Sequence, residues 1–224
     1  MKNYQYILLD WDGNLAKTLD LWLEACRVPL EKRGLHLSDN EVASCFGMLS
    51  ERFQEWGITD IDQAIEELHE VAAERMPEVD LYPEVLPVLE KLRMADKKIA
   101  LVTGTRRAHV LLILDKYNIH HFFDVIVTGE DTERHKPDPQ PLEKALELLD
   151  GTVEQAVVIG DSDKDIGAAN NAGIDSILFF PPEHARFYDR AELEALHPTW
   201  IVDDFRQVFN IIHPPVVPRF ARAA

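Results

Sequence analysis

The sequence contains few cysteines and no long apolar run, and each shortage excludes a class of protein. Its two cysteines, Cys26 and Cys45, form no CxxC pair, so we expect free thiols in a reducing compartment rather than a disulfide scaffold. The chain has no apolar run of about 18 residues, which argues against a membrane span. Residues Met1 to Tyr6 lack the apolar stretch and cleavage site of a signal peptide. A cytoplasmic location is therefore expected.

Basic residues are also scarce. The chain has 23 Lys and Arg against 40 Asp and Glu, a formal net charge of −17. This balance argues against nucleic acid as a partner, because a phosphate backbone requires basic patches. It does not exclude a small phosphorylated substrate, since a bound magnesium ion and one or two cations can invert the local field. A length of 224 residues suits one compact domain with an insertion.

Short apolar runs alternate with amphipathic stretches along most of the chain. The runs are rich in Ile, Val and Leu and lie at residues 6–9, 99–102, 125–127, 156–159 and 176–180. Continuous runs of this kind are typical of strands that are buried on both faces of a parallel sheet. Helices are predicted from Pro83, after a cap at Thr105, from Pro141, and over 163–172 with Gly173 just beyond its end. The sequence therefore predicts an α/β fold with a doubly wound parallel sheet.

One segment, residues 16–80, contains no strand signal. Ser38 to Glu41 form a capping box, and a further helix is expected to start at Asp60. We predict an inserted helical cap at 16–80 that acts as a lid on a core formed by 1–15 and 81–212. The proline-rich residues 213–224 are predicted to be a mobile tail.

Polar residues follow three of the predicted strands. Asp10 and Asp12 follow the first, Thr103 the second and Asp161 the fourth. Ligands of open parallel sheets bind beyond the carboxyl ends of the strands, so these residues should meet at one edge. Clustered carboxylates suit magnesium, and a carboxylate beside magnesium can attack phosphorus. A second acid is needed for proton transfer, and Lys136 can hold phosphoryl oxygens.

These residues resemble the motifs of the haloacid dehalogenase superfamily of phosphatases. The similarity is to the branch with a helical cap after the first motif, which includes phosphoglycolate phosphatase-like enzymes and β-phosphoglucomutase. It covers roughly residues 4–212, with four motifs in order: 10–13, Thr103, Lys136-Pro137, and 160–162 with Asp165. The resemblance implies a Rossmann-like core and a magnesium-dependent phosphohydrolase.

The resemblance also implies roles for individual residues. Asp10 corresponds to the nucleophile and Asp12 to the general acid and base. The implied magnesium ligands are Asp10, Asp12 through its backbone carbonyl, Asp161 and, in support, Asp165. The phosphate-binding groups are Thr103, the backbone near Gly104, and Lys136.

Other residues are candidates for contact with the substrate. Asn14 stands where family members usually have threonine, and Lys17 where they often have aspartate. Asn14 can still form hydrogen bonds, so an altered rate is expected rather than an inactive site. Arg52 is a further candidate, because it falls near the cap loop that faces the site in this family. Trp22, with the other aromatic residues of the cap, is expected in the core.

The leading function is hydrolysis of a small phosphate monoester, and other functions stay open. A sugar phosphomutase of the same family needs a histidine soon after the first motif, where this chain has residues 19–23 without one. Dehalogenases lack the second aspartate, so Asp12 argues against that activity. A phospho-switch of the receiver type carries its acceptor on a later strand. A catalytically silent phospho-ligand-binding protein is suggested only by Asn14. The substrate and the oligomeric state are not encoded in any recognisable pattern.

Overall fold

A computed structural model describes residues 2–214 and contains one six-stranded parallel sheet. The strands are β1 (Tyr6–Leu9), β2 (Lys98–Val102), β3 (Val125–Val127), β4 (Ala156–Gly160), β5 (Asp175–Phe179) and β6 (Trp200–Val202). Their order is β3-β2-β1-β4-β5-β6, and every neighbouring pair is parallel. The strand β1 therefore lies in the middle, between β2 and β4, and the predicted doubly wound sheet is confirmed.

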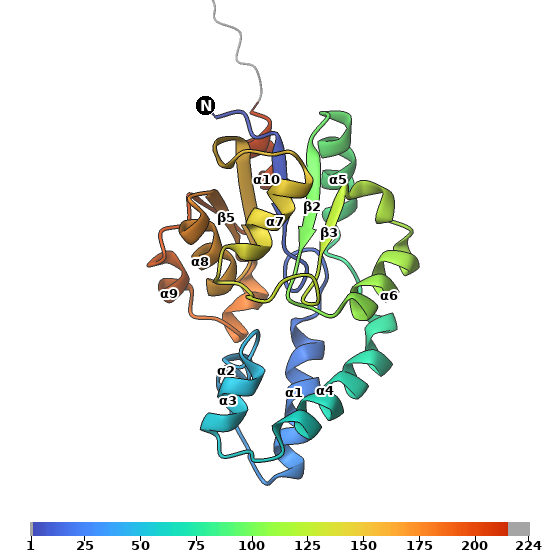
Figure 1. Ribbon diagram of the computed structural model, residues 1–224, viewed down its shortest axis with the longest axis vertical. Helices are drawn as coiled ribbons and strands as arrows, with labels where there is room; N and C mark the ends of the chain where they lie inside the picture. The colour runs from blue at the N-terminus through green and yellow to red at the C-terminus, as the bar shows by residue number, and fades with distance from the viewer. Residues whose placement is uncertain (1, 215–224) are drawn as a thin grey trace, which may run out of the picture.

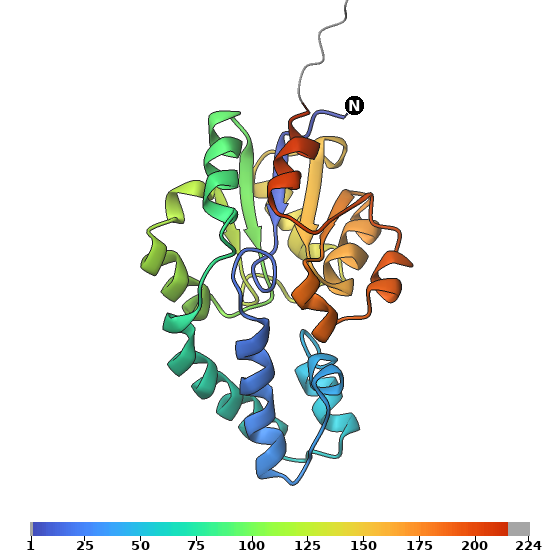
Figure 2. The ribbon, with the colours of Figure 1, turned by 180° about the vertical axis from the view of Figure 1, so that it is seen from behind.

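Helices cover both faces of this sheet (Figures 1 and 2). Those of the sheet layers are α5 (Val85–Met94), α6 (Arg107–Tyr117), α7 (Gln140–Leu148), α8 (Asp163–Ala172), α9 (Arg190–Glu194) and α10 (Arg206–Ile212), with short 3₁₀ turns at His120–Phe122, Val153–Gln155 and Pro182–Arg186 (η4). Side chains alternate along each strand. Ile7 and Leu9 join the apolar core that includes α5, α6 and α10, whereas Leu8 joins the core that includes α7 and α8.

Two details of the core differ from the sequence prediction. The edge strand β6 was not predicted, because it is only three residues long and Ile201 within it is 36% exposed. Thr105 is not the cap of the following helix, because that position is taken by Arg106. The predicted end of α8 is confirmed: Gly173 has a φ of +68°, a left-handed conformation that suits glycine.

Residues 16–80, which we call the helical region, connect β1 to the rest of the core. They contain α1 (Leu19–Lys32), α2 (Asp39–Ala43), α3 (Leu49–Glu55), α4 (Ile61–Arg75) and a 3₁₀ turn at Met76–Glu78. The predicted capping box of Ser38 and Glu41 is present at α2. The chain leaves and re-enters the core side by side, because the Lys17 amide donates to the Asp80 carbonyl at 2.8 Å.

The helical region lies beyond the carboxyl ends of the strands, which point toward it (Figure 1). Both cysteines belong to it, and they are buried free thiols with sulfur atoms 3.4 Å apart. Among residues 2–214, no helix is both long enough and apolar enough to cross a lipid bilayer. The predicted tail falls mostly on residues 215–224, outside the described residues.

Candidate active site

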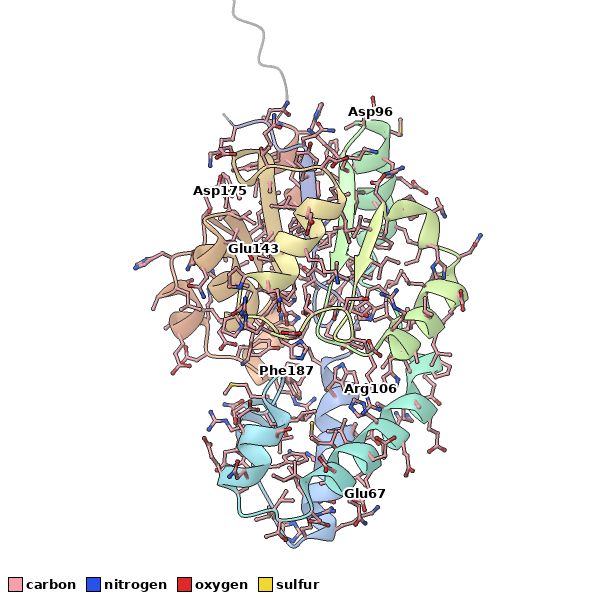
Figure 3. All side chains as sticks on the ribbon, viewed as in Figure 1. Glu67, Asp96, Arg106, Glu143, Asp175 and Phe187 are labelled. Carbon is pink, nitrogen blue, oxygen red and sulfur yellow. The ribbon has the colours of Figure 1, made fainter. Side chains whose placement is uncertain are left out.

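A cavity of about 540 Å³ lies between the carboxyl ends of the strands and the helical region. Figure 3 shows Arg106 and Phe187 at this junction, and Arg106 lines the cavity. The predicted site residues on the cavity wall are Asp10, Asp12, Thr103, Gly104, Lys136, Asp161 and Asp165. The structure therefore brings together the residues that follow β1, β2 and β4, although they lie far apart along the chain.

A tight turn after β1 places Asp10 at the sheet edge. The Asp10 amide still bonds a carbonyl of β4 at 2.9 Å, whereas the chain then turns so that the Ala16 amide bonds the Trp11 carbonyl at 3.0 Å. Gly13 within this turn has a φ of +67°, and a Cβ there would lie 2.2 Å from Oδ2 of Asp161. Only glycine lets the turn pack this closely against Asp161.

Lys136 is the central cation of the site. Its ammonium donates to Oδ1 of Asp10 at 2.6 Å, to Oδ1 of Asp165 at 2.5 Å and to the Val102 carbonyl at 3.1 Å. These three bonds use all three donors of a lysine ammonium. Lys136 must therefore give up one of them before it can donate to a phosphoryl oxygen.

The buried carboxyl groups of the site oppose one another. Burial, together with the nearby Asp165, raises the pKa of Asp10 to about 8 against the lowering effect of Lys136. Burial and the charge of Asp10 also raise the pKa of Asp161 well above its ordinary value. Burial alone would lower the pKa of Lys136, but Asp10 and Asp165 raise it above its usual range. The cluster thus has more negative charge than Lys136 neutralises.

Asp12 is held from two sides by neutral donors. The indole nitrogen of Trp22 donates to Oδ1 of Asp12 at 2.6 Å. The hydroxyl of Thr105 donates to Oδ2 at 2.5 Å, and that of Thr103 lies 3.4 Å from the same oxygen. These bonds fix the carboxylate beside Asp10 without a second cation.

The donor set fits a hard divalent cation. Asp10, Asp161 and Asp165 each offer an oxygen, and these oxygens lie within 4.8 Å of one another. Oδ2 of Asp161 is buried and has no hydrogen-bond partner, which is costly unless a cation satisfies it. The Asp12 carboxylate is not part of this group and points toward Trp22. Oxygen donors of this kind suit magnesium.

Three predicted substrate contacts do not line the cavity. Asn14 is fully buried and donates to the backbone carbonyls of Asp10 and Ile159, at 2.9 and 3.3 Å. Lys17 lies over the ring of Tyr82, with its nitrogen 5.1 Å from the ring centroid. Arg52 pairs with Glu55 at 2.7 Å on α3. In this structure Asn14 therefore supports the turn after β1, and the side chains of Lys17 and Arg52 are engaged outside the cavity wall.

Several cavity residues were not identified from the sequence. Thr105 had been interpreted only as a helix cap, although it stands two residues after Thr103 and so follows the same strand end. Trp22 packs against the apolar core, as expected, but its contact with Asp12 was not predicted. His69 of α4 lines the wall and stacks on His109 of α6, with ring centroids 5.5 Å apart. Nothing in the local sequence predicts that stacking, because it depends on how α4 docks on α6.

The fold and the site define the chain as a haloacid dehalogenase-like hydrolase. Residues 7–179 match the family described as "Haloacid dehalogenase-like hydrolase", and the chain belongs to that family. It is 34% identical over 216 residues to a putative pyrophosphatase PpaX of Caldanaerobacter subterraneus subsp. tengcongensis, covering 92% of this chain and 93% of the relative.

Solved structures agree with this assignment. A putative haloacid dehalogenase-like hydrolase from Bacteroides fragilis has a TM-score of 0.80 at 28% identity, covering 92% of this chain and 100% of the other. A predicted phosphoglycolate phosphatase from Haemophilus somnus has a TM-score of 0.81 at 25% identity, covering 94% and 99%. The resemblance stated from the motifs is confirmed, and the chain is a phosphatase of this family.

Proposed function

We propose that the protein is a magnesium-dependent phosphatase that hydrolyses a small phosphate monoester through an aspartyl-phosphate on Asp10. The observation that carries this proposal is the convergence of Asp10, Asp12 and Lys136 on one cavity with a carboxylate cluster behind them. Asp10 lies at the end of the central strand, where it is open to the cavity. Asp12 lies two residues further on and is held separately from the Lys136 network.

Each residue has a defined task in this mechanism. An oxygen of Asp10 attacks phosphorus, and the bond from phosphorus to the leaving oxygen breaks. Asp12 gives its proton to the leaving oxygen, then takes a proton from the water that cleaves the aspartyl-phosphate. The hydroxyl of Thr103, the backbone amides near Gly104 and the ammonium of Lys136 hold the phosphoryl oxygens.

The residues that would hold magnesium are Asp10, Asp161 and, in support, Asp165, together with the backbone carbonyl of Asp12. When bound, magnesium neutralises charge on the cluster and on the transferring phosphoryl group. The chain's own contribution is to keep these oxygens close and buried, so that the carboxylates stay ionised only when a cation compensates them. Asp10 would therefore be ionised, and able to act as a nucleophile, when magnesium is bound.

Pyrophosphate hydrolysis is the second candidate, because the relative from Caldanaerobacter carries that name. It needs the same groups around phosphorus and differs only in the leaving group. The helical region would serve as a lid in either reaction, excluding water when it closes. We further propose a cytoplasmic location, which is supported by the two buried free thiols.

A turnover assay tests this function. The purified protein should release phosphate from 4-nitrophenyl phosphate when magnesium is present, lose that activity in EDTA and regain it on addition of magnesium. The Asp10→Asn variant, which is nearly isosteric, should be folded and inactive. Full activity in EDTA would contradict the role of magnesium, and full activity of Asp10→Asn would contradict the role of Asp10 as the nucleophile.

A further inference from the structure

The cavity has two chemically different halves. The half formed by the core contains Asp10, Lys136 and the other groups that face phosphorus. The half formed by the helical region has a mostly apolar wall, made by Leu19, Trp22, Cys26, Phe46, Leu49 and Ile65. With phosphorus held at Asp10, the leaving group of the substrate must extend into this second half.

The wall of the helical region has no positive charge. Its charged residue is Glu51, at the start of α3. Its histidine, His69, is neutral at physiological pH, because burial, with Arg106 nearby, lowers its pKa to about 4. The two cations that could have supplied charge are directed elsewhere, since Arg52 pairs with Glu55 and Lys17 lies over Tyr82.

Two basic residues on the core side of the cavity, Lys164 and Arg106, already have carboxylate partners. Lys164 lies 2.9 Å from Asp163, and its side chain is only 17% exposed. Arg106 lies 3.4 Å from Glu66 of α4, and Glu130 adds a further carboxylate to the wall. An anionic leaving group would therefore enter a half-cavity that is apolar and has unfavourable charge, at the cost of its hydration.

We infer that the substrate is a phosphate monoester whose organic part is uncharged and apolar, rather than a diphosphate or a phosphorylated carboxylic acid. This inference rests on the proposed phosphatase activity and adds the chemical class of the leaving group. It differs from what the names of the relatives suggest, since pyrophosphate and phosphoglycolate both present a second anion. A volume of about 540 Å³ also accommodates an organic group considerably larger than a second phosphate.

A series of alkyl phosphates tests the inference on the wild-type enzyme. Methyl, propyl and pentyl phosphate have leaving groups of similar reactivity, so differences in kcat/KM between them report how much of the substrate's alkyl group is buried. We expect kcat/KM to rise about fourfold for each methylene until the wall is filled. Propyl phosphate should also exceed phosphoglycolate, which has a similar size, and pyrophosphate. A flat or falling series, or preference for either anionic substrate, would overturn the inference.

Variants of the cavity wall show whether the helical region causes the preference for apolar leaving groups. Leu49→Ser should flatten the dependence on chain length, whereas Leu148→Ser, at an exposed position of α7 outside the cavity, should keep it. Glu51→Gln should raise kcat/KM for phosphoglycolate by about fivefold, the effect of removing one like charge at close range. Thermal melting establishes that each variant is folded. Equal slopes in Leu49→Ser and Leu148→Ser would place the organic group elsewhere and overturn the inference.

Acetyl phosphate separates the inference from the function on which it rests. It is small and activated, so it needs the catalytic groups but not the apolar wall. Hydrolysis of acetyl phosphate that depends on magnesium, combined with a flat alkyl series, would overturn the inference and leave the phosphatase proposal intact. Failure to hydrolyse any of these phosphates would overturn both.

Discussion

The indole nitrogen of Trp22 donates a 2.6 Å hydrogen bond to Oδ1 of Asp12. Trp22 belongs to α1 of the helical region, and Asp12 belongs to the turn after β1. The bond therefore makes the orientation of the proposed acid and base depend on how the helical region docks on the core. The other oxygen of Asp12 accepts a hydrogen bond from Thr105 of the core. Trp22 and Thr105 thus form a clamp on Asp12, and only the Trp22 side depends on docking of the helical region.

The clamp predicts a specific defect for Trp22→Phe, which keeps an aromatic ring but removes the donor. A well-placed general acid contributes roughly 10²–10⁴-fold, most for poor leaving groups. We expect kcat to fall at least about tenfold for an alkyl phosphate and much less for 4-nitrophenyl phosphate. Trp56→Phe, at a half-buried tryptophan of the same region, is the matched control. Equal losses on both substrates would show that Trp22 acts only through packing.

Asp161→Asn should have opposite effects with and without magnesium. Without metal, burial and Asp10 disfavour the Asp161 carboxylate, so the amide should raise the melting temperature in EDTA at pH 8. Added magnesium should raise the melting temperature of the wild type more than that of Asp161→Asn, since a ligand at 100 times its Kd adds about 2.7 kcal/mol to the free energy of unfolding. Differential scanning calorimetry measures both. An equal gain from magnesium in the variant would remove Asp161 from the ligands.

His69 gives a pH dependence with a defined sign. Its pKa is about 4 in the folded protein and about 6.5 in an unfolded chain. The unfolded chain therefore binds the proton more readily between these values, and the His69 contribution lowers stability as pH falls from about 6.5 to about 4. His69→Gln should reduce this loss relative to wild type.

A direct NMR titration tests the same group. The imidazole resonance that is missing from His69→Gln should show no titration midpoint between about pH 8 and pH 5, given the lowered pKa. A midpoint near the ordinary histidine value would contradict the prediction. It would also place a positive charge on the apolar wall near neutral pH.

Arg186 forms a second link between the core and the helical region. From η4 of the core, it contacts Asp20 of α1 at 2.5 Å and Asp39 at α2 at 2.6 Å. If the helical region moves as a lid, Arg186→Gln should favour the open form and increase the radius of gyration measured by X-ray scattering. Stability should change by less than about 1 kcal/mol, since these are surface pairs.

The matched control for this change is Arg190→Gln. Arg190 is equally exposed, but its partner, Glu194, lies one turn further along α9. Arg190→Gln should leave the scattering profile unchanged. Identical profiles for wild type, Arg186→Gln and Arg190→Gln would mean that the Arg186 contacts do not hold the helical region closed.

The positions of Asp10 and Asp161 were predictable because parallel strands bring their carboxyl ends to one edge. The runs that form β1 and β4 are strongly apolar, so the sheet and the residues after it follow from local pattern. The contact of Trp22 with Asp12 was not predictable, because it depends on the angle at which α1 packs on the core. For Thr105 the spacing from Thr103 did contain the information, but capping was the commoner local explanation.

In the helical region, too, only part of the structure could be predicted from the sequence. Its helices and the capping box at Ser38 follow from periodicity, whereas the directions of Lys17 and Arg52 do not. Both are long side chains whose positions are set by neighbouring partners, Tyr82 and Glu55. Their positions in the sequence suggested contact with the substrate, but neither residue is on the cavity wall.

The most direct test of the account is a crystal structure with magnesium and beryllium fluoride, which mimics a phosphoryl group on a carboxylate. If Asp10 is the nucleophile, we expect continuous density from beryllium to a carboxylate oxygen of Asp10, with Thr103 and Lys136 donating to the fluorides and magnesium contacting Asp161. Beryllium fluoride bound to another residue, while Asp10 keeps its contact with Lys136, would contradict the assignment of Asp10 as the nucleophile.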